Sequence, residues 1–179
     1  MKSRLSPAIR RTVALAAFVT ACAPVLLNAQ EQERSSQHHG RRTFFTLLNG
    51  VSEAPSVSST GRGSFLLVID RNDDEMQFTL GYSRLEGATV TQAHVHFGQP
   101  NTVGGVSFFL CGGGGKPPCP LGPVTITGTV VPADVLGPAN QGIAAGEFGE
   151  ILAAIRNGDA YVNVHTDKHP GGEIRGHLR

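Results

Sequence analysis

The chain has 179 residues, enough for one domain with a hydrophobic core, and its 23 glycines and 11 prolines suit short strands and tight turns better than long helices. Four of the 15 basic residues lie in the first 29 residues, which contain no acid, so the rest of the chain carries a small net negative charge. A surface without a basic excess lacks the electrostatic attraction on which nucleic-acid binding depends, and we expect no nucleic-acid partner.

The first 29 residues have the order of a secretory signal peptide. The basic residues end at Arg11, an apolar run extends over Thr12–Leu27, and the small residue Ala29 precedes a polar stretch. The run is short for a membrane span, so we expect a signal peptide at 1–29, no transmembrane span, and a secreted, periplasmic or cell-envelope location. The alternative is a lipoprotein anchored at Cys22, because the residues before this cysteine match a lipoprotein cleavage pattern.

Two cysteines remain if the signal peptide is removed. Cys111 and Cys119 are separated by a short loop of glycine, lysine and proline, which is easy to close. An oxidising compartment favours a disulfide between them, and the alternative is two free thiols.

The alternation of apolar residues predicts a series of strands. Residues 30–41 are polar and are expected to form a disordered lead-in, with one domain over 42–179. Strands are expected at 43–51, 64–70, 75–83, 89–97, 106–111, 124–131, 160–166 and 173–178. The turn-rich segment 70–74 predicts a hairpin between the second and third of these.

One helix interrupts the strands, at about 147–157. Phe148, Ile151, Leu152 and Ile155 form a single apolar stripe at helical spacing, and Asn157-Gly158 provides a C-terminal stop. Many short strands with one short crossover helix predict an all-β fold, an antiparallel β-sandwich of immunoglobulin-like or superoxide-dismutase-like type.

Three of the expected strands carry a polar face. Side chains two residues apart on a strand point to the same side, so His94 and His96 share one face, and Tyr161, Asn163 and His165 share another. The last strand adds a third polar face. If the strands are adjacent, these faces build one polar cluster of His94, His96, Tyr161, Asn163, His165, Glu173 and Arg175.

The same strands carry a family resemblance. In order, the stretches His94–Gly98, Phe108–Cys111, Ile155–Gly158, Tyr161–Thr166 and Gly172–Gly176 resemble the CHRD (chordin-type) domain family, from about residue 42 to the end of the chain. The closing stretch, from the helix to Gly-Glu-Ile-Arg-Gly, is the specific part. The resemblance implies an extracellular β-sandwich module, and it supplies no catalytic residues to carry over.

Two functions therefore stay open. The first is a secreted or envelope-associated binding or structural module that needs no cofactor, has an extracellular or envelope protein or a small ligand as partner, and uses its histidines for internal hydrogen bonds. The second is a copper- or zinc-dependent enzyme or a metal-binding protein that uses His94, His96 and His165. The sequence does not establish a catalytic activity. Glu173 and Arg175 are expected to form a structural ion pair or to face solvent.

Overall fold

The computed structural model describes residues 40–179. The expected signal peptide at 1–29, with Cys22, and all but the last two residues of the expected lead-in at 30–41 lie outside the described residues. Within 40–179, no helix is long and apolar enough to cross a membrane. The strands are β1 (Thr43–Asn49), β2 (Arg62–Ile69), β3 (Met76–Ser83), β4 (Val90–Phe97), β5 (Gly105–Cys111), β6 (Val124–Val130), β7 (Ala160–Thr166) and β8 (Ile174–His177), with the helix α2 (Phe148–Asn157) before β7.

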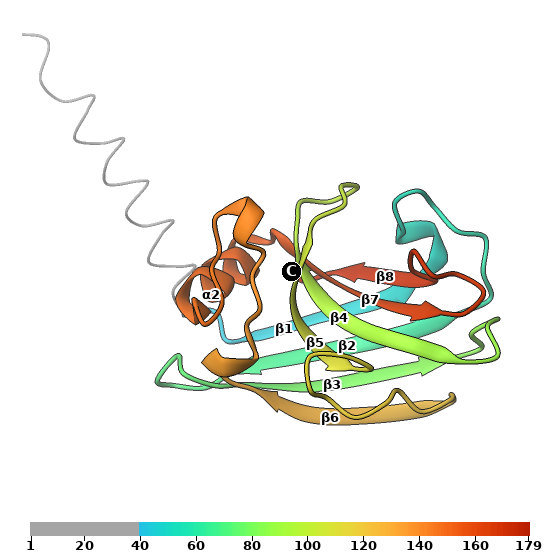
Figure 1. Ribbon diagram of the computed structural model, residues 1–179, viewed down its shortest axis with the longest axis horizontal. Helices are drawn as coiled ribbons and strands as arrows, with labels where there is room; N and C mark the ends of the chain where they lie inside the picture. Colours follow the sequence, from blue (N-terminus) through green and yellow to red (C-terminus); the bar gives the residue numbers. More distant parts are fainter. Residues whose placement is uncertain (1–39) are drawn as a thin grey trace, which may run out of the picture. The chain divides into compact units, whose positions relative to one another are not determined.

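All eight strands belong to one antiparallel sheet (Figure 1). Their order is β5-β4-β7-β8-β1-β2-β3-β6, so β5 and β6 form the two edges. Over residues 40–179, the predicted all-β antiparallel fold with one short α-helix between strands is confirmed. The structure refines it in one respect, because the strands form one nearly closed sheet that wraps around the core, without a break into two separate layers.

The hairpin of β2 and β3 has a local cause in the sequence. The two strands pair from Arg62 opposite Ser83 to Ile69 opposite Met76. At the turn, the carboxylate of Asp70 accepts backbone hydrogen bonds from Asn72, Asp74 and Glu75 at 2.9, 3.0 and 3.2 Å. This carboxylate organises the turn and thereby holds the register of the pair.

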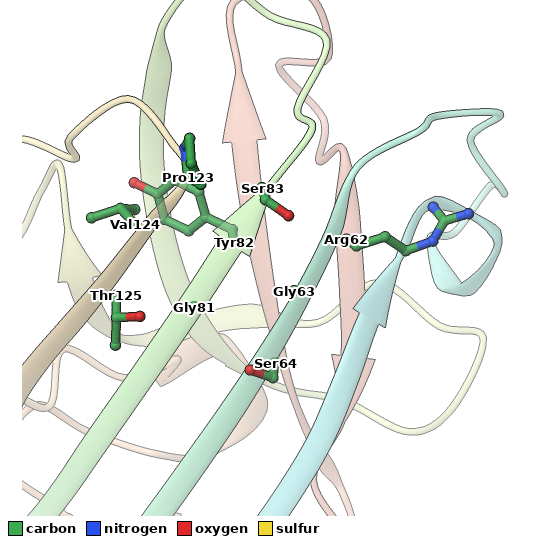
Figure 2. Close-up of a pocket in the computed structure, with 9 residues that line it drawn as sticks. All are labelled: Arg62, Gly63, Ser64, Gly81, Tyr82, Ser83, Pro123, Val124 and Thr125. Carbon is green, nitrogen blue, oxygen red and sulfur yellow. The ribbon is translucent and has the colours of Figure 1, made fainter.

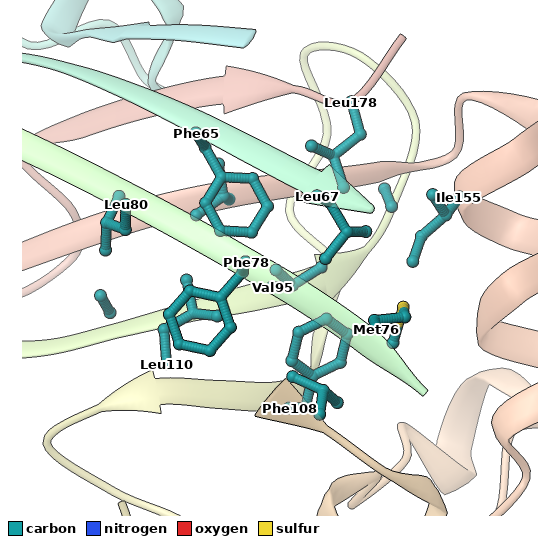
Figure 3. Packing of buried hydrophobic residues seen from close by; sticks show 14 of the residues in the cluster. Phe65, Leu67, Met76, Phe78, Leu80, Val95, Phe108, Leu110, Ile155 and Leu178 are labelled. Atoms are coloured by element: carbon teal, nitrogen blue, oxygen red, sulfur yellow. The ribbon is translucent and has the colours of Figure 1, made fainter. Parts of the chain in front are cut away.

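The core lies on the concave side of the sheet, and α2 packs against it. Figure 3 shows side chains from several strands gathered with Ile155 of the helix, and these belong to one buried cluster. Phe148, Ile151 and Leu152 are buried as well, as their helical spacing predicts. The helix ends at Gly158, whose left-handed φ of 84° directs its N–H back to the last carbonyls of α2.

A disulfide joins the end of the edge strand β5 to the segment before β6. Cys111 and Cys119 are bonded, with their Cα atoms 5.0 Å apart. Gly112, Gly114 and Gly115 in the intervening loop have positive φ, a conformation that glycine adopts without strain. The loop predicted to close between these cysteines therefore closes.

Candidate metal centre

Three histidines from two neighbouring strands converge on one region of the sheet. β4 pairs with β7 so that His94 lies opposite Asn163, while Gln92 lies opposite His165. The ring centre of His94 is 4.4 Å from that of His96 and 4.6 Å from that of His165. One ring nitrogen of each histidine lies within 4.8 Å of those of the other two. The group could therefore hold one metal ion.

These histidines lie on the face of the sheet opposite the core, and they are nevertheless buried. Ala93 and Val95 alternate with them along β4 and are fully buried on the core side. On the other side, His94, His96 and His165 have exposed fractions of only 2, 7 and 6%. Loops must therefore cover this face, and the hydrogen bonds of the imidazoles identify two of them.

Backbone carbonyls from two loops orient two of the imidazoles. Nδ1 of His96 lies 2.9 Å from the carbonyl oxygen of Gly104, and Nδ1 of His165 lies 2.9 Å from that of Pro170. A carbonyl accepts only, so each Nδ1 carries the proton and each Nε2 carries a lone pair. Nε2 of His165 and Nδ1 of His94 are buried and have no hydrogen-bond partner in the structure.

Asn163 lies beside the histidines and is within hydrogen-bond distance of His96. Its side-chain oxygen is 3.1 Å from Nε2 of His96. Because that nitrogen carries a lone pair, Asn163 satisfies it by presenting the NH₂ group instead, after a half-turn of the amide. Asn163 thus provides one neutral hydrogen-bond partner to the three histidines.

Burial keeps the three imidazoles neutral. Burial lowers the pKa of His94 to about 2, with a further contribution from the neighbouring His96 and His165. Burial lowers the pKa of His96 to about 4 and also lowers that of His165. All three are therefore uncharged at neutral pH, and a neutral imidazole is the form that binds metals.

A stacked arrangement of aromatic and cationic groups flanks the histidines. The ring of Tyr161 stacks on His96, with centres 4.6 Å apart and planes at 5°. The guanidinium carbon of Arg175 lies 3.3 Å from the centre of the Tyr161 ring, a cation–π contact. Arg175 also donates a hydrogen bond of 2.7 Å to the carbonyl of Thr102, and its Nε is buried without a partner. The buried positive charge of Arg175 is therefore separated from His96 by the ring of Tyr161.

Glu173 does not join this group. It is fully buried, and its carboxylate accepts hydrogen bonds of 2.7 Å from the hydroxyls of Ser59 and Thr166 and from the backbone N–H of Glu86. Arg175 is buried as well, exposed by 1%, and its hydrogen bonds go to other partners. The expectation of solvent exposure is wrong for both residues, because loops cover them.

The structure thus divides the polar cluster expected from the sequence. Contacts link six of its members, which are His94, His96, Tyr161, Asn163, His165 and Arg175. Glu173 instead forms its hydrogen bonds with Ser59, Glu86 and Thr166. Glu53 is a further buried carboxyl that no sequence pattern indicated. Burial raises its pKa to about 7, and Arg175 acts in the opposite direction. Glu53 lies in the loop between β1 and β2, where no alternation of apolar residues signals burial.

A shallow hollow of about 520 Å³ lies elsewhere on the sheet, over β2, β3 and the start of β6 (Figure 2). Its lining includes Ser64, Tyr82 and Thr125, and it shares no residue with the histidine site. The hydroxyl of Tyr82 is already engaged, because it donates to the carbonyl of Pro120. The hollow is open and holds no group of titratable side chains besides Arg62 and Tyr82.

Comparisons with known proteins agree with the resemblance of the strands. No curated protein and no solved structure matches the chain. The family model of the CHRD domain matches residues 44–178, which spans every strand of the sheet except the first residue of β1. The chain therefore belongs to the CHRD domain family.

Proposed function

We propose that this protein is an exported CHRD-domain binding module whose histidine site holds one transition-metal ion, copper or zinc. His94, His96 and His165 are the ligands. The observation that carries the proposal is that three buried imidazoles converge and two of them are fixed by a backbone carbonyl on Nδ1. Nε2 of His165 is left without a partner, and Nε2 of His96 contacts the side-chain amide of Asn163.

This arrangement is typical of metal-binding histidines. A histidine ligand commonly donates its second ring N–H to a carbonyl or carboxylate, which sets its tautomer and its orientation. In an ordinary hydrogen-bond network, by contrast, buried nitrogens find partners. An unsatisfied buried group costs about 1–3 kcal/mol, and two such nitrogens are present among these three rings. A metal ion would remove that cost at His165 directly.

Export is supported by the apolar run in the first 29 residues and by the disulfide. We propose a secreted or cell-envelope location for the mature protein, with Ala29 as the last residue removed. Sequencing of the mature N-terminus tests this. A chain that begins with a lipid-modified Cys22 would replace this proposal by a membrane-anchored lipoprotein.

Metal analysis of purified protein tests the binding function. The mature chain is produced without a polyhistidine tag, stripped with a chelator, and titrated with Cu²⁺ or Zn²⁺ while elemental analysis measures the metal retained after dialysis. Because His38 and His39 could bind metal by themselves, both are replaced by Ala in the background. We expect one equivalent of metal in this background.

Matched variants identify the ligands. His94→Ala and His165→Ala should each weaken metal binding by at least about tenfold, as expected when a group that holds the ion is removed. His169→Ala is the control, because it also removes a partly buried imidazole with an unpartnered nitrogen but lies outside the three-histidine group. Equal binding by all variants, or no stoichiometric metal in the parent, would refute the proposal.

A further inference from the structure

The charge and number of the ligands distinguish copper from zinc at this site, and the argument rests on the metal-binding function proposed above. Among the described residues, the group of close metal-binding side chains consists of three histidines, without a carboxylate or a thiolate. All three are neutral, so the bound ion keeps its full charge. Asn163, the polar side chain that contacts His96, offers a neutral oxygen or NH₂ group and adds no negative charge.

The surroundings make a high charge costly. The free-energy cost of burying an ion scales with the square of its charge, so a divalent ion costs about four times as much as a monovalent one in the same site. Arg175 adds to this cost, because its buried positive charge lies against the ring of Tyr161, which stacks on His96.

The cover over the site limits the coordination number. Zn²⁺ in proteins is almost always four-coordinate, and with three protein ligands it takes a water molecule as the fourth. Here Phe109 meets His94 edge to face at 5.1 Å, and Tyr161 stacks on His96. The three histidines are nearly inaccessible to solvent. Imidazole is a ligand of copper as well as of zinc. Cu⁺ is stable with two or three ligands and needs no water to complete its coordination.

We infer that the three-histidine site selects Cu⁺ over Zn²⁺ and holds it in a three-coordinate, all-imidazole geometry. The ion is bound as Cu⁺ and no electron transfer is required. The ligands are one ring nitrogen of His94 and Nε2 of His96 and of His165, and the carbonyls of Gly104 and Pro170 hold the last two rings at Nδ1. The amide of Asn163 gives up its contact with Nε2 of His96 when the ion binds.

Competition between metal ions tests the selectivity. Anaerobic, chelator-stripped protein in the background without His38 and His39 is titrated with Cu⁺ against bicinchoninate, and separately with Zn²⁺ against a chromogenic zinc chelator. We expect the dissociation constant for Cu⁺ to be lower than that for Zn²⁺ by at least about tenfold. X-ray absorption of the copper-loaded protein should give three nitrogen neighbours and the edge of a three-coordinate Cu⁺.

The effect of Arg175 provides a second measurement. In Arg175→Gln, the repulsion removed is about twice as large for a divalent ion as for a monovalent one, so the affinity for Zn²⁺ should rise by more than that for Cu⁺. Circular dichroism first checks that the variant is folded. If it is not folded, the dissociation constants of Cu⁺ and Zn²⁺ measured on the parent protein test the selectivity by themselves.

The outcomes separate this inference from the proposed function. If Zn²⁺ binds more tightly than Cu⁺ and still depends on the three histidines, the selectivity is refuted and the metal-binding function stands. If neither ion is retained, both fail. If copper binds with a fourth ligand, the three-coordinate geometry is refuted.

Discussion

Removal of the Glu173 carboxylate should destabilise the fold strongly, although this residue lies outside the histidine site. One carboxylate connects three segments, because it accepts hydrogen bonds from Ser59 before β2, from the backbone of Glu86 before β4, and from Thr166 at the end of β7. Each bond is 2.7 Å long, and hydrogen bonds to a charged group contribute about 1.5–3 kcal/mol. Glu173 itself is fully buried.

The magnitude depends on the substitution. Glu173→Ala leaves three donors without their acceptor, and we expect a loss of about 3–5 kcal/mol in the free energy of unfolding, since such contributions are not additive. Glu173→Gln keeps one oxygen, which serves both Ser59 and Glu86, and places an NH₂ group against the hydroxyl of Thr166, which can turn and accept. We expect about 1–2 kcal/mol for this variant.

Urea unfolding followed by circular dichroism measures both values at neutral pH. Glu150→Gln, at an exposed position of α2, is the control and should change the free energy by less than about 0.5 kcal/mol. A loss below about 1 kcal/mol for Glu173→Ala would show that the three segments are held by other contacts and would refute the reasoning.

Three further predictions concern the helix, the disulfide and the pH. Ile151→Ala should lower the free energy of unfolding by about 2–5 kcal/mol in a urea titration, because the side chain is fully buried, and a loss below about half a kcal/mol would contradict its role in the core. Reduction of the Cys111–Cys119 disulfide should cost about 2–3 kcal/mol, measured by melts with and without reductant, whereas two thiols free for alkylation in native exported protein would contradict the bond. The free energy of unfolding should fall as the pH drops below 6.5. Burial lowers the pKa of His94 to about 2 and those of His96 and His177 to about 4. Between these values and pH 6.5 the unfolded chain therefore binds protons that the folded chain does not, which favours unfolding. Glu53, with its raised pKa, has the opposite effect on stability between pH 7 and 4.5, but it is a single group and the histidines are three. A melting temperature that stays constant from pH 7 to 5 would refute the prediction.

The strands and the helix could be predicted because their signals are local. Apolar residues alternate along β3, and they recur at helical spacing in α2, so both elements follow from which residues must be buried. The same alternation places His94 and His96 on one face of β4. The sequence could not indicate that this outward face is buried, because its cover consists of loops without periodicity.

Long-range partners explain the remaining differences. The hydrogen bond from Nδ1 of His165 to the carbonyl of Pro170 depends on the path of a turn, and that of His96 on the loop that ends at Gly104. Glu173 was grouped with Arg175 because they lie two residues apart, yet its partners are separated from it by 7 to 114 residues along the chain. Whether eight strands form one curled sheet or two layers is likewise decided by pairings between distant strands, such as β1 with β8.

The position of the last two strands in the sheet has a consequence for how the protein folds. β7 and β8 are synthesised after the other six strands of the sheet but lie in its middle, where they join β4 on one side to β1 on the other. Until they are present, the earlier strands form two unconnected halves, β5-β4 and β1-β2-β3-β6, each with unpaired edges that invite association with other chains. Contacts between such distant segments also slow folding. The earlier strands therefore depend on protection from aggregation until β7 and β8 have been synthesised.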